Sequence, residues 1–171
     1  MAVDTISIRP ADVTVAWHGT AARVAAFVLL TALGAMVRIP LPFTPVPLTL
    51  QTFAVMLAGF MLTPRAAFAS QALYVIGGLS GLPFLAVAAT GTIGYLAGFV
   101  IAAPVVSLLS HRGKGAAATF AGVGIIHLCG CAGLSLYGVP TGIGLFVAGS
   151  LPFLPGDMLK AFVAARIATR R

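Results

Sequence analysis

The chain has 171 residues, of which 60% are hydrophobic and only 8% are charged. A soluble domain usually carries about 25% charged residues, so this composition leaves too little polar surface for a globule in water. It excludes a soluble enzyme, a disordered regulator and a disulfide-rich secreted module. The formal net charge of +7 does not indicate a nucleic-acid partner, because the Lys and Arg residues are scattered singly between apolar runs. The composition predicts an integral membrane protein.

The first 20 residues are the most polar stretch and contain two of the three acidic residues. A secretory signal peptide begins with positive charge and continues with about 7–15 apolar residues, and this stretch does neither. We therefore expect a retained N-terminal cytoplasmic extension over residues 1–20, followed by a single membrane domain over residues 21–171.

Charged residues, prolines and glycines divide the membrane domain into apolar segments. A crossing helix needs about 20 residues, and fewer when flanking side chains such as Arg23 and Arg38 reach the headgroups. Residues 39–48 contain four prolines, which predicts an ordered extended loop, and the Gly-rich segment 77–83 predicts a second break. The expected spans are about 22–39, 49–63, 66–77, 93–110, 116–136 and 155–169, with a short helix near 143–151. The predicted fold class is all-α, with six transmembrane helices.

The positive charges of a six-span chain fall almost entirely on one side of the membrane. When the loops alternate, that side has Arg9, Arg23, Arg65, Arg112, Lys114, Arg166, Arg170 and Arg171, whereas the other side has Arg38 alone. Cytoplasmic loops carry the excess of Lys and Arg. We therefore expect a multi-pass protein of the cytoplasmic membrane with both termini in the cytoplasm. Its outer loops are uncharged and rich in glycine and proline, which suits the covering of a pocket.

Asp157 and Lys160 are the two residues of fixed charge expected inside the membrane, three positions apart on one helix face. Ionised groups in hydrocarbon cost several kcal/mol and usually mark a pathway or a ligand site. A structural ion pair is the alternative. We favour a ligand site, because the pair follows a helix broken by Pro152 and Pro155, and broken helices place free backbone groups beside binding sites.

Polar residues also begin two other helices on the outer side. Gln51 is at the start of the second span, and Thr92, Gly94 and Tyr95 are at the start of the fourth, where glycine lets backbone N–H groups approach a ligand. Three helix starts therefore predict one small, mostly apolar pocket. His127, in the middle of the fifth span, is expected to be an interior, hydrogen-bonded side chain. No G-x-x-x-x-G-K-[ST] segment is present, so the chain itself does not use ATP, and no cofactor or metal site is expected.

Small residues recur at a spacing of four on the first span, with Ala22 and Ala26 among them. Such a face permits close approach of another helix in lipid. Internal packing and contact with a partner subunit both fit this pattern.

Three groups of residues carry a resemblance to a known family. They are Pro45–Thr52 with Leu57–Gly59, Gly77–Pro83 with Gly94–Phe99, and Leu151–Lys160. These segments resemble the BioY family, the biotin-specific substrate-binding (S) components of energy-coupling-factor (ECF) transporters. The segment LPFLPGDMLK is similar to the family's signature at its last helix. The resemblance extends in order from about residue 21 to the C-terminus.

The resemblance implies a six-helix bundle that holds biotin near the outer face. It implies that Asp157 and Lys160 contact the vitamin and that the proline loop acts as a gate. An apolar wall for the sulfur ring and valeryl chain would come from Phe43, Phe53 or Phe84. The implied partners are a membrane coupling subunit and two ATP-binding-cassette ATPases. Weak transport without these partners, and self-association of the chain, are both left open.

Two other functions compete with biotin capture. The segment 84–95 is shorter than the family pattern, which leaves an S component for another vitamin as an alternative. A different class is an intramembrane enzyme that uses Asp157 or His127 as an acid–base group. That alternative lacks a second catalytic group at a matched spacing.

Overall fold

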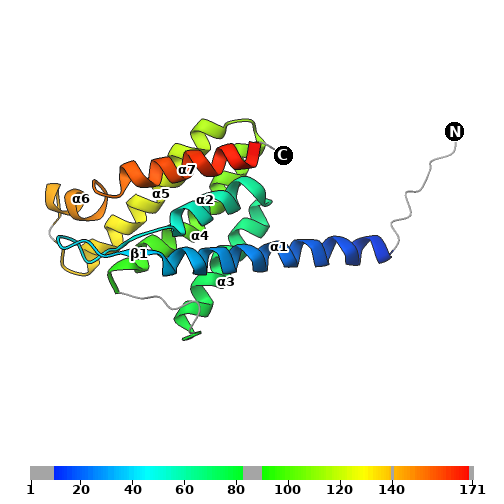
Figure 1. The fold of residues 1–171 in the computed structure, drawn as a ribbon, viewed down its shortest axis with the longest axis horizontal. Coiled ribbons are helices and arrows are strands. Elements are labelled where there is room, and N and C mark those ends of the chain that lie inside the picture. The colour runs from blue at the N-terminus through cyan, green and yellow to red at the C-terminus, as the bar shows by residue number, and fades with distance from the viewer. Residues whose placement is uncertain (1–9, 83–89, 140, 170–171) are drawn as a thin grey trace.

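The chain folds into a bundle of α-helices with one small β-ribbon (Figure 1). The structure is a computed structural model and describes residues 10–82, 90–139 and 141–169. The helices are α1 Pro10–Met36, α2 Gln51–Met61, α3 Pro64–Leu79, α4 Ile93–His111, α5 Gly115–Leu136, α6 Ile143–Gly149 and α7 Leu154–Thr169, and the short 3-10 turn η2 Thr90–Thr92 precedes α4. In the ribbon, β1 (Arg38–Ile39) pairs antiparallel with β2 (Leu48–Thr49). The all-helical class is confirmed.

Most of the observed helix ends lie within two residues of the predicted ones. The exception is α1, which begins at Pro10 and ends at Met36 instead of spanning residues 22–39. Proline is well suited to the first position of a helix, so part of the polar segment before residue 20 is helical. The helix ends early because Arg38 and Ile39 pair with β2.

Helices α4 and α5 form the most extensive contact in the bundle, and α2 packs against α1, α4 and α7. Glycines allow α4 and α5 to approach closely: a Cβ atom added to Gly133 would lie 2.6 Å from the Cα atom of Gly94. Close backbone approach of this kind stabilises helix pairs in lipid. Gly94 therefore packs against α5, and the expected approach of backbone N–H groups to a ligand here stays a prediction.

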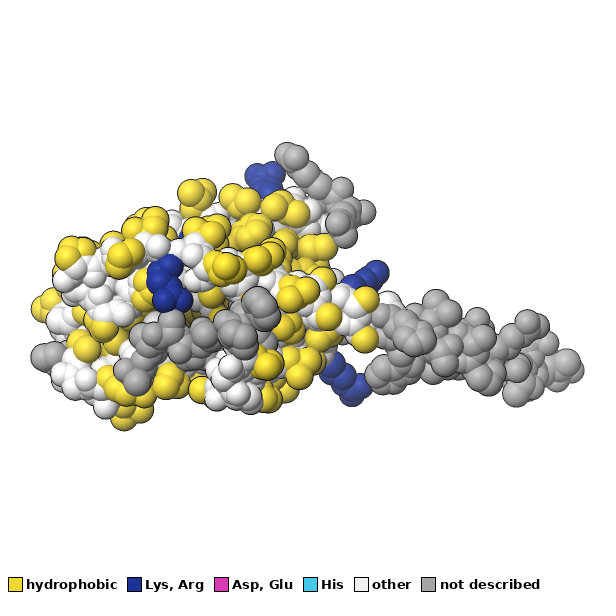
Figure 2. Space-filling view, turned by 60° about the horizontal axis from the view of Figure 1, so that its bottom comes forward, with side chains coloured by type: hydrophobic (Ala, Val, Ile, Leu, Met, Phe, Trp, Pro, Cys, Tyr) yellow, Lys and Arg dark blue, Asp and Glu magenta, His cyan; other side chains and the backbone are white. Residues whose placement is uncertain are grey.

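The outside of the bundle is strongly apolar. Leu128, Leu136 and Ile143 are among many large hydrophobic side chains that are exposed, and Figure 2 shows such side chains over one face with few Lys or Arg between them. Soluble monomers rarely expose so much contiguous apolar surface. This surface is typical of a protein surrounded by lipid.

Three helices of the described part are long and apolar enough to cross a membrane, namely Gly19–Met36, Ile93–His111 and Gly115–Leu136. The other main helices are shorter, with 11 residues in α2 and 16 each in α3 and α7. At a rise of 1.5 Å per residue they extend about 16 to 24 Å, less than the hydrocarbon thickness of about 30 Å. The structure thus supports a membrane protein, and the number of six crossings stays a prediction.

The two ends of the bundle differ in character. Figure 1 places the ribbon and α6 together at one end, and the C-terminus at the opposite end, where α1 extends beyond the other helices. The starts of α2, α4 and α7 meet at the ribbon end, as the sequence predicts. A cavity is found there.

Candidate ligand-binding site

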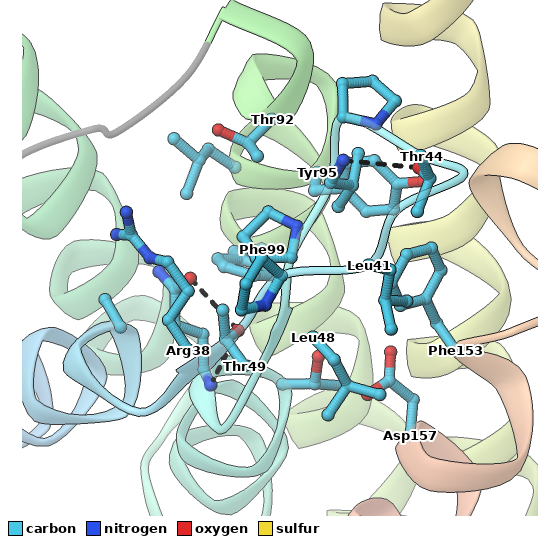
Figure 3. Close-up of a pocket in the computed structure, with 18 of the residues that line it drawn as sticks. Arg38, Leu41, Thr44, Leu48, Thr49, Thr92, Tyr95, Phe99, Phe153 and Asp157 are labelled. Carbon is cyan, nitrogen blue, oxygen red and sulfur yellow. Dashed lines mark hydrogen bonds between the residues drawn. The ribbon is translucent and has the colours of Figure 1, made fainter.

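A cavity of about 270 Å³ lies between the ribbon and the helix starts (Figure 3). Its volume is close to the lower end of the range of about 300–1,000 Å³ that small-molecule sites occupy. The proline loop 40–48 forms one wall, and the other walls come from α1, α2, α3, α4 and α7 with the turn before it. The lining residues are Ala35, Arg38, Pro40, Leu41, Thr44, Pro45, Val46, Pro47, Leu48, Thr49, Gln51, Thr52, Tyr74, Thr92, Tyr95, Leu96, Phe99, Phe153 and Asp157.

The proline loop is held in place at both of its ends. Pairing of β1 with β2 joins the two ends to each other, and the backbone N–H of Leu50 donates to the carbonyl of Gly34 in α1 at 3.1 Å. Proline fixes φ and removes a backbone donor, so the loop keeps an extended shape without a helical hydrogen-bond ladder. The loop therefore forms a wall of defined shape over the helix starts.

Aromatic side chains supply much of the apolar surface of the cavity. Tyr95 and Phe153 contact each other edge to face, with ring centroids 6.5 Å apart, and Phe99 lies one turn after Tyr95 on α4. The Tyr95 hydroxyl donates to the carbonyl of Gly149 and so connects α4 to the end of α6. A Cβ atom on Gly130 would overlap the Tyr95 ring, so glycine at this position lets the ring lie directly on α5.

Asp157 is the carboxylate of the cavity. It is buried in the first turn of α7, where the helix dipole favours an anion. Its Oδ1 atom accepts a hydrogen bond of 2.8 Å from Lys160 Nζ, and its Oδ2 atom lies 3.3 Å from His127 Nε2. Lys160 Nζ also donates to the carbonyl of Thr49 at 2.6 Å. The charge of Asp157 is therefore balanced by Lys160, and the same ammonium reaches β2.

The environment of His127 departs from the sequence prediction. The ring is buried, and it contacts the Tyr95 ring edge to face at 6.3 Å. Neither ring nitrogen has a hydrogen-bond partner of good geometry among the described residues, although Nε2 is directed near Asp157. The expected hydrogen-bonded interior histidine is thus interior but not hydrogen-bonded.

A second polar group borders the cavity at the start of α2. Gln51 Nε2 donates to the Tyr74 hydroxyl at 2.8 Å, and the backbone N–H of Gln51 donates to Thr49 Oγ1 at 3.3 Å. These bonds join α2, α3 and β2 at the cavity wall. They fix where the Gln51 side chain lies.

Four of the predicted site residues meet in the cavity lining, namely Gln51, Thr92, Tyr95 and Asp157. Lys160 does not line the cavity, and it is connected to the cavity by its hydrogen bond to Asp157. Phe84 lies outside the described residues. The two other phenylalanines considered for the apolar wall are elsewhere: Phe43 is exposed and Phe53 packs against the core.

Sequence reasoning did not assign several lining residues to the site. Phe99 and Phe153 look like ordinary membrane-helix residues, although each lies inside a segment that resembles the BioY family. Tyr74 is brought to the cavity by the packing of α3, which spacing alone does not reveal. Arg38, interpreted as a headgroup anchor, also lines the cavity. The available signal is its isolation as the one positive charge predicted on its side of the membrane.

The predicted partner surface is exposed in the described part of the chain. Ala22 and Ala26 are both exposed on α1. Contact of these two alanines with a partner subunit stays a prediction.

A helical bundle with an apolar exterior and a partly enclosed cavity at one end defines a membrane-embedded protein that binds a small molecule.

Comparison with known proteins gives the family. The BioY family model matches residues 9–171. The chain is 36% identical over 156 residues to a probable biotin transporter BioY from Pyrococcus horikoshii, which covers 86% of this chain and 92% of that protein. It is 37% identical over 157 residues to the biotin transporter BioY of Thermotoga maritima, with coverage of 84% and 90%. The chain therefore belongs to the BioY family.

A solved structure shares the fold. The crystal structure of the S-component for biotin from an ECF-type ABC transporter superposes with a TM-score of 0.78 at 24% sequence identity, covering 96% of this chain and 94% of that one. The family resemblance seen in the sequence is confirmed. The chain belongs to a transporter family, so the alternative of an intramembrane enzyme is not supported.

Proposed function

We propose that this chain is the substrate-binding component of a biotin uptake system and that it captures biotin from outside the cytoplasmic membrane. The observation that carries the proposal is the cavity bounded by Asp157, in a chain related over most of its length to biotin transporters. The proposed partners are lipid, a membrane coupling subunit and two ATP-binding-cassette ATPases. The transported vitamin is substrate, and no cofactor is invoked.

Biotin matches the chemistry of the cavity walls. Its ureido ring has two N–H donors, and the Asp157 carboxylate is the acceptor that lines the cavity. Its sulfur ring and valeryl chain are apolar and match the aromatic wall formed by Tyr95, Phe99 and Phe153. Burial of an unpaired carboxylate costs several kcal/mol, and the Lys160 ammonium at 2.8 Å offsets that cost.

Further residues belong to the proposed site. Thr92 and Gln51 offer polar groups on the walls contributed by the starts of α4 and α2. We keep Phe84 as a proposed apolar contact, because the sulfur ring and valeryl chain of biotin need an apolar wall. Lys160 contributes to biotin binding through its bond to Asp157, because Asp157 borders the cavity and Lys160 does not.

The proposed membrane arrangement has six crossings, both termini in the cytoplasm and the cavity facing outward. The segment before residue 21 is then a cytoplasmic extension of the membrane domain. The charge asymmetry supports this orientation, because the turn between α4 and α5 contains Arg112 and Lys114, while Arg38 is the one Lys or Arg in the loops expected on the opposite side. In Figure 1 the start of α1 and the C-terminus lie toward the same end of the bundle, which agrees with an even number of crossings.

Equilibrium binding of labelled biotin to the purified protein in detergent or nanodiscs tests the proposal. We expect saturable binding that unlabelled biotin displaces and that thiamine and riboflavin do not. No saturable binding of labelled biotin, together with saturable binding of another labelled vitamin, would contradict the proposal and favour an S component of different specificity.

A further inference from the structure

Arg38 places a cation at the cavity whose charge nothing in the described structure balances. It belongs to β1, is exposed and lines the cavity. Over the described ranges its side chain forms neither a hydrogen bond nor an ion pair. The other fixed charges at the site are matched, because Lys160 is bound to Asp157. The cavity therefore has one unbalanced positive charge.

The two acidic residues within the described ranges, Asp12 and Asp157, are not placed to balance this charge. Asp12 is near the start of α1, and at 1.5 Å per residue it is about 36 Å from Met36, where that helix ends next to Arg38. Asp157 is bound by Lys160 and lies 3.3 Å from His127. No described acidic residue therefore supplies a carboxylate to Arg38.

The position of Arg38 relative to Asp157 suits an elongated ligand. Both residues line the same cavity, and Figure 3 shows them on opposite sides of it. Apolar side chains, with Leu48 and Phe99 among them, contribute to the wall. A molecule that fills this space meets an acceptor on one side, apolar surface along its length and a cation on the other side.

We propose that Arg38 binds the carboxylate of the ligand, so that the cavity selects monoanions with N–H donors at the opposite end. The inference rests on the proposed function for the identity of that ligand. In biotin the ureido ring and the carboxylate of the valeryl chain are at opposite ends of the molecule. A guanidinium binds a carboxylate through two parallel hydrogen bonds. Arg38 then determines specificity for the acid over its neutral derivatives.

Binding of two ligands to two proteins tests the assignment directly. The ligands are biotin and biotinamide, which differ only at the end of the tail, where biotin has a carboxylate and biotinamide a neutral carboxamide. The proteins are the parent and Arg38→Gln. A charge-assisted hydrogen bond is worth about 1.5–3 kcal/mol, so Arg38→Gln is expected to weaken biotin binding by about 10- to 150-fold. The affinity for biotinamide is expected to stay unchanged, which also shows that the variant is folded.

Two further variants make the comparison specific. Arg23→Gln removes an exposed cation from α1 away from the cavity, and we expect it to change neither affinity. Lys160→Met is expected to weaken the binding of both ligands by the same factor, because Lys160 bonds to Thr49 in the cavity wall and to Asp157. The proposal would be overturned if Lys160→Met weakened the binding of biotin but not of biotinamide, and Arg38→Gln weakened neither. That result would show that Lys160 binds the carboxylate of the ligand.

The remaining outcomes are also decisive. If Arg38→Gln weakened the binding of both ligands equally, Arg38 would only shape the ribbon. If it weakened the binding of neither ligand, Arg38 would only anchor to lipid headgroups. Either result overturns the assignment while leaving biotin as the ligand. A parent protein that binds neither ligand would instead overturn the proposed function, and the Arg38 assignment with it.

Discussion

The ammonium of Lys160 lies 2.6 Å from the backbone carbonyl oxygen of Thr49, a residue 111 positions earlier in the chain. The same Nζ atom donates to Asp157 Oδ1 at 2.8 Å. Thr49 is in β2, whose pairing with β1 holds together the two ends of the proline loop. One partly buried cation therefore connects the carboxylate of the cavity to the loop that covers it.

Loss of this connection is expected to let the proline loop open. Lys160→Met leaves the Thr49 carbonyl without its donor, a change worth about 1–3 kcal/mol and so about 5- to 150-fold in the population of an opened loop. The measurement is the rate at which a water-soluble maleimide labels Val46→Cys, a buried loop position, in ligand-free protein without Cys129 and Cys131. We expect the rate to rise by that factor.

A matched position in the same loop controls for general loosening of the protein. Phe43 is 59% exposed, so Phe43→Cys should be labelled at the same rate with and without the Lys160 change. An unchanged rate at Val46→Cys in the Lys160→Met variant would show that Lys160 does not restrain the loop.

The close approach of the Tyr95 ring to α5 depends on a single glycine. A Cβ atom on Gly130 would overlap that ring, so Gly130→Ala is expected to displace Tyr95, lower the stability by about 1–3 kcal/mol and weaken biotin binding. Thermal unfolding and biotin titration measure both effects. Gly124, on the same helix, has no atom within 4 Å of an added Cβ, and Gly124→Ala should change neither property. Equal behaviour of the two variants would exclude a packing role for Gly130.

The orientation can be read from labelling of single cysteines in intact cells. We expect Ser80→Cys and Tyr137→Cys to react with an impermeant reagent from outside, and Arg112→Cys to react only after permeabilisation. These positions adjoin Gly81, Gly138 and Gly113, whose positive φ angles make direct substitution there strained. The reverse pattern would contradict the orientation inferred from the charges.

The exposed alanines of α1 are expected to contact the coupling subunit. Ala22→Leu and Ala26→Leu add bulk where close helix approach needs small residues, so uptake with the coupling subunits should fall while biotin binding by the isolated chain is unaffected. Ala97 is an exposed alanine on α4, and Ala97→Leu is the matched control that should retain uptake. Normal uptake by the α1 variants would remove these alanines from the interface, and a change in oligomeric state alone would assign them to self-association.

Sequence patterns predicted the elements that depend on local chemistry. The ends of α4 and α5 are set by a charged Gly-containing turn and by the Gly and Pro residues near residue 138, and such signals are visible in any single chain. The convergence of Gln51, Tyr95 and Asp157 also followed, because three helix starts predicted on the same side have to meet at one end of a short bundle. The start of α1 was missed because polarity before residue 20 suggested an extension, whereas Pro10 begins a helix.

Contacts between distant helices were not predictable from spacing. Gln71 and Tyr74 are one turn apart and suggest a mutual hydrogen bond, yet Gln71 bonds to Thr31 in α1 and Tyr74 to Gln51 in α2. The bond from Lys160 to Thr49 and the contact of Gly130 with Tyr95 likewise depend on how helices pack. These contacts decide which side chains border the cavity, so the lining had to come from the structure.

The central claim is that the carboxylate of Asp157 is part of a biotin site and not only half of a structural ion pair. Removing one member of a buried pair costs about 3–5 kcal/mol, whereas removing both is often nearly neutral. Biotin titration beside thermal unfolding for Asp157→Asn, Lys160→Met and the double variant is the most direct test. We predict that the singly changed proteins are destabilised and that the double variant regains stability close to the parent but binds biotin at least about tenfold more weakly, the loss of one charge-assisted hydrogen bond. A stable double variant that binds biotin like the parent would contradict the account.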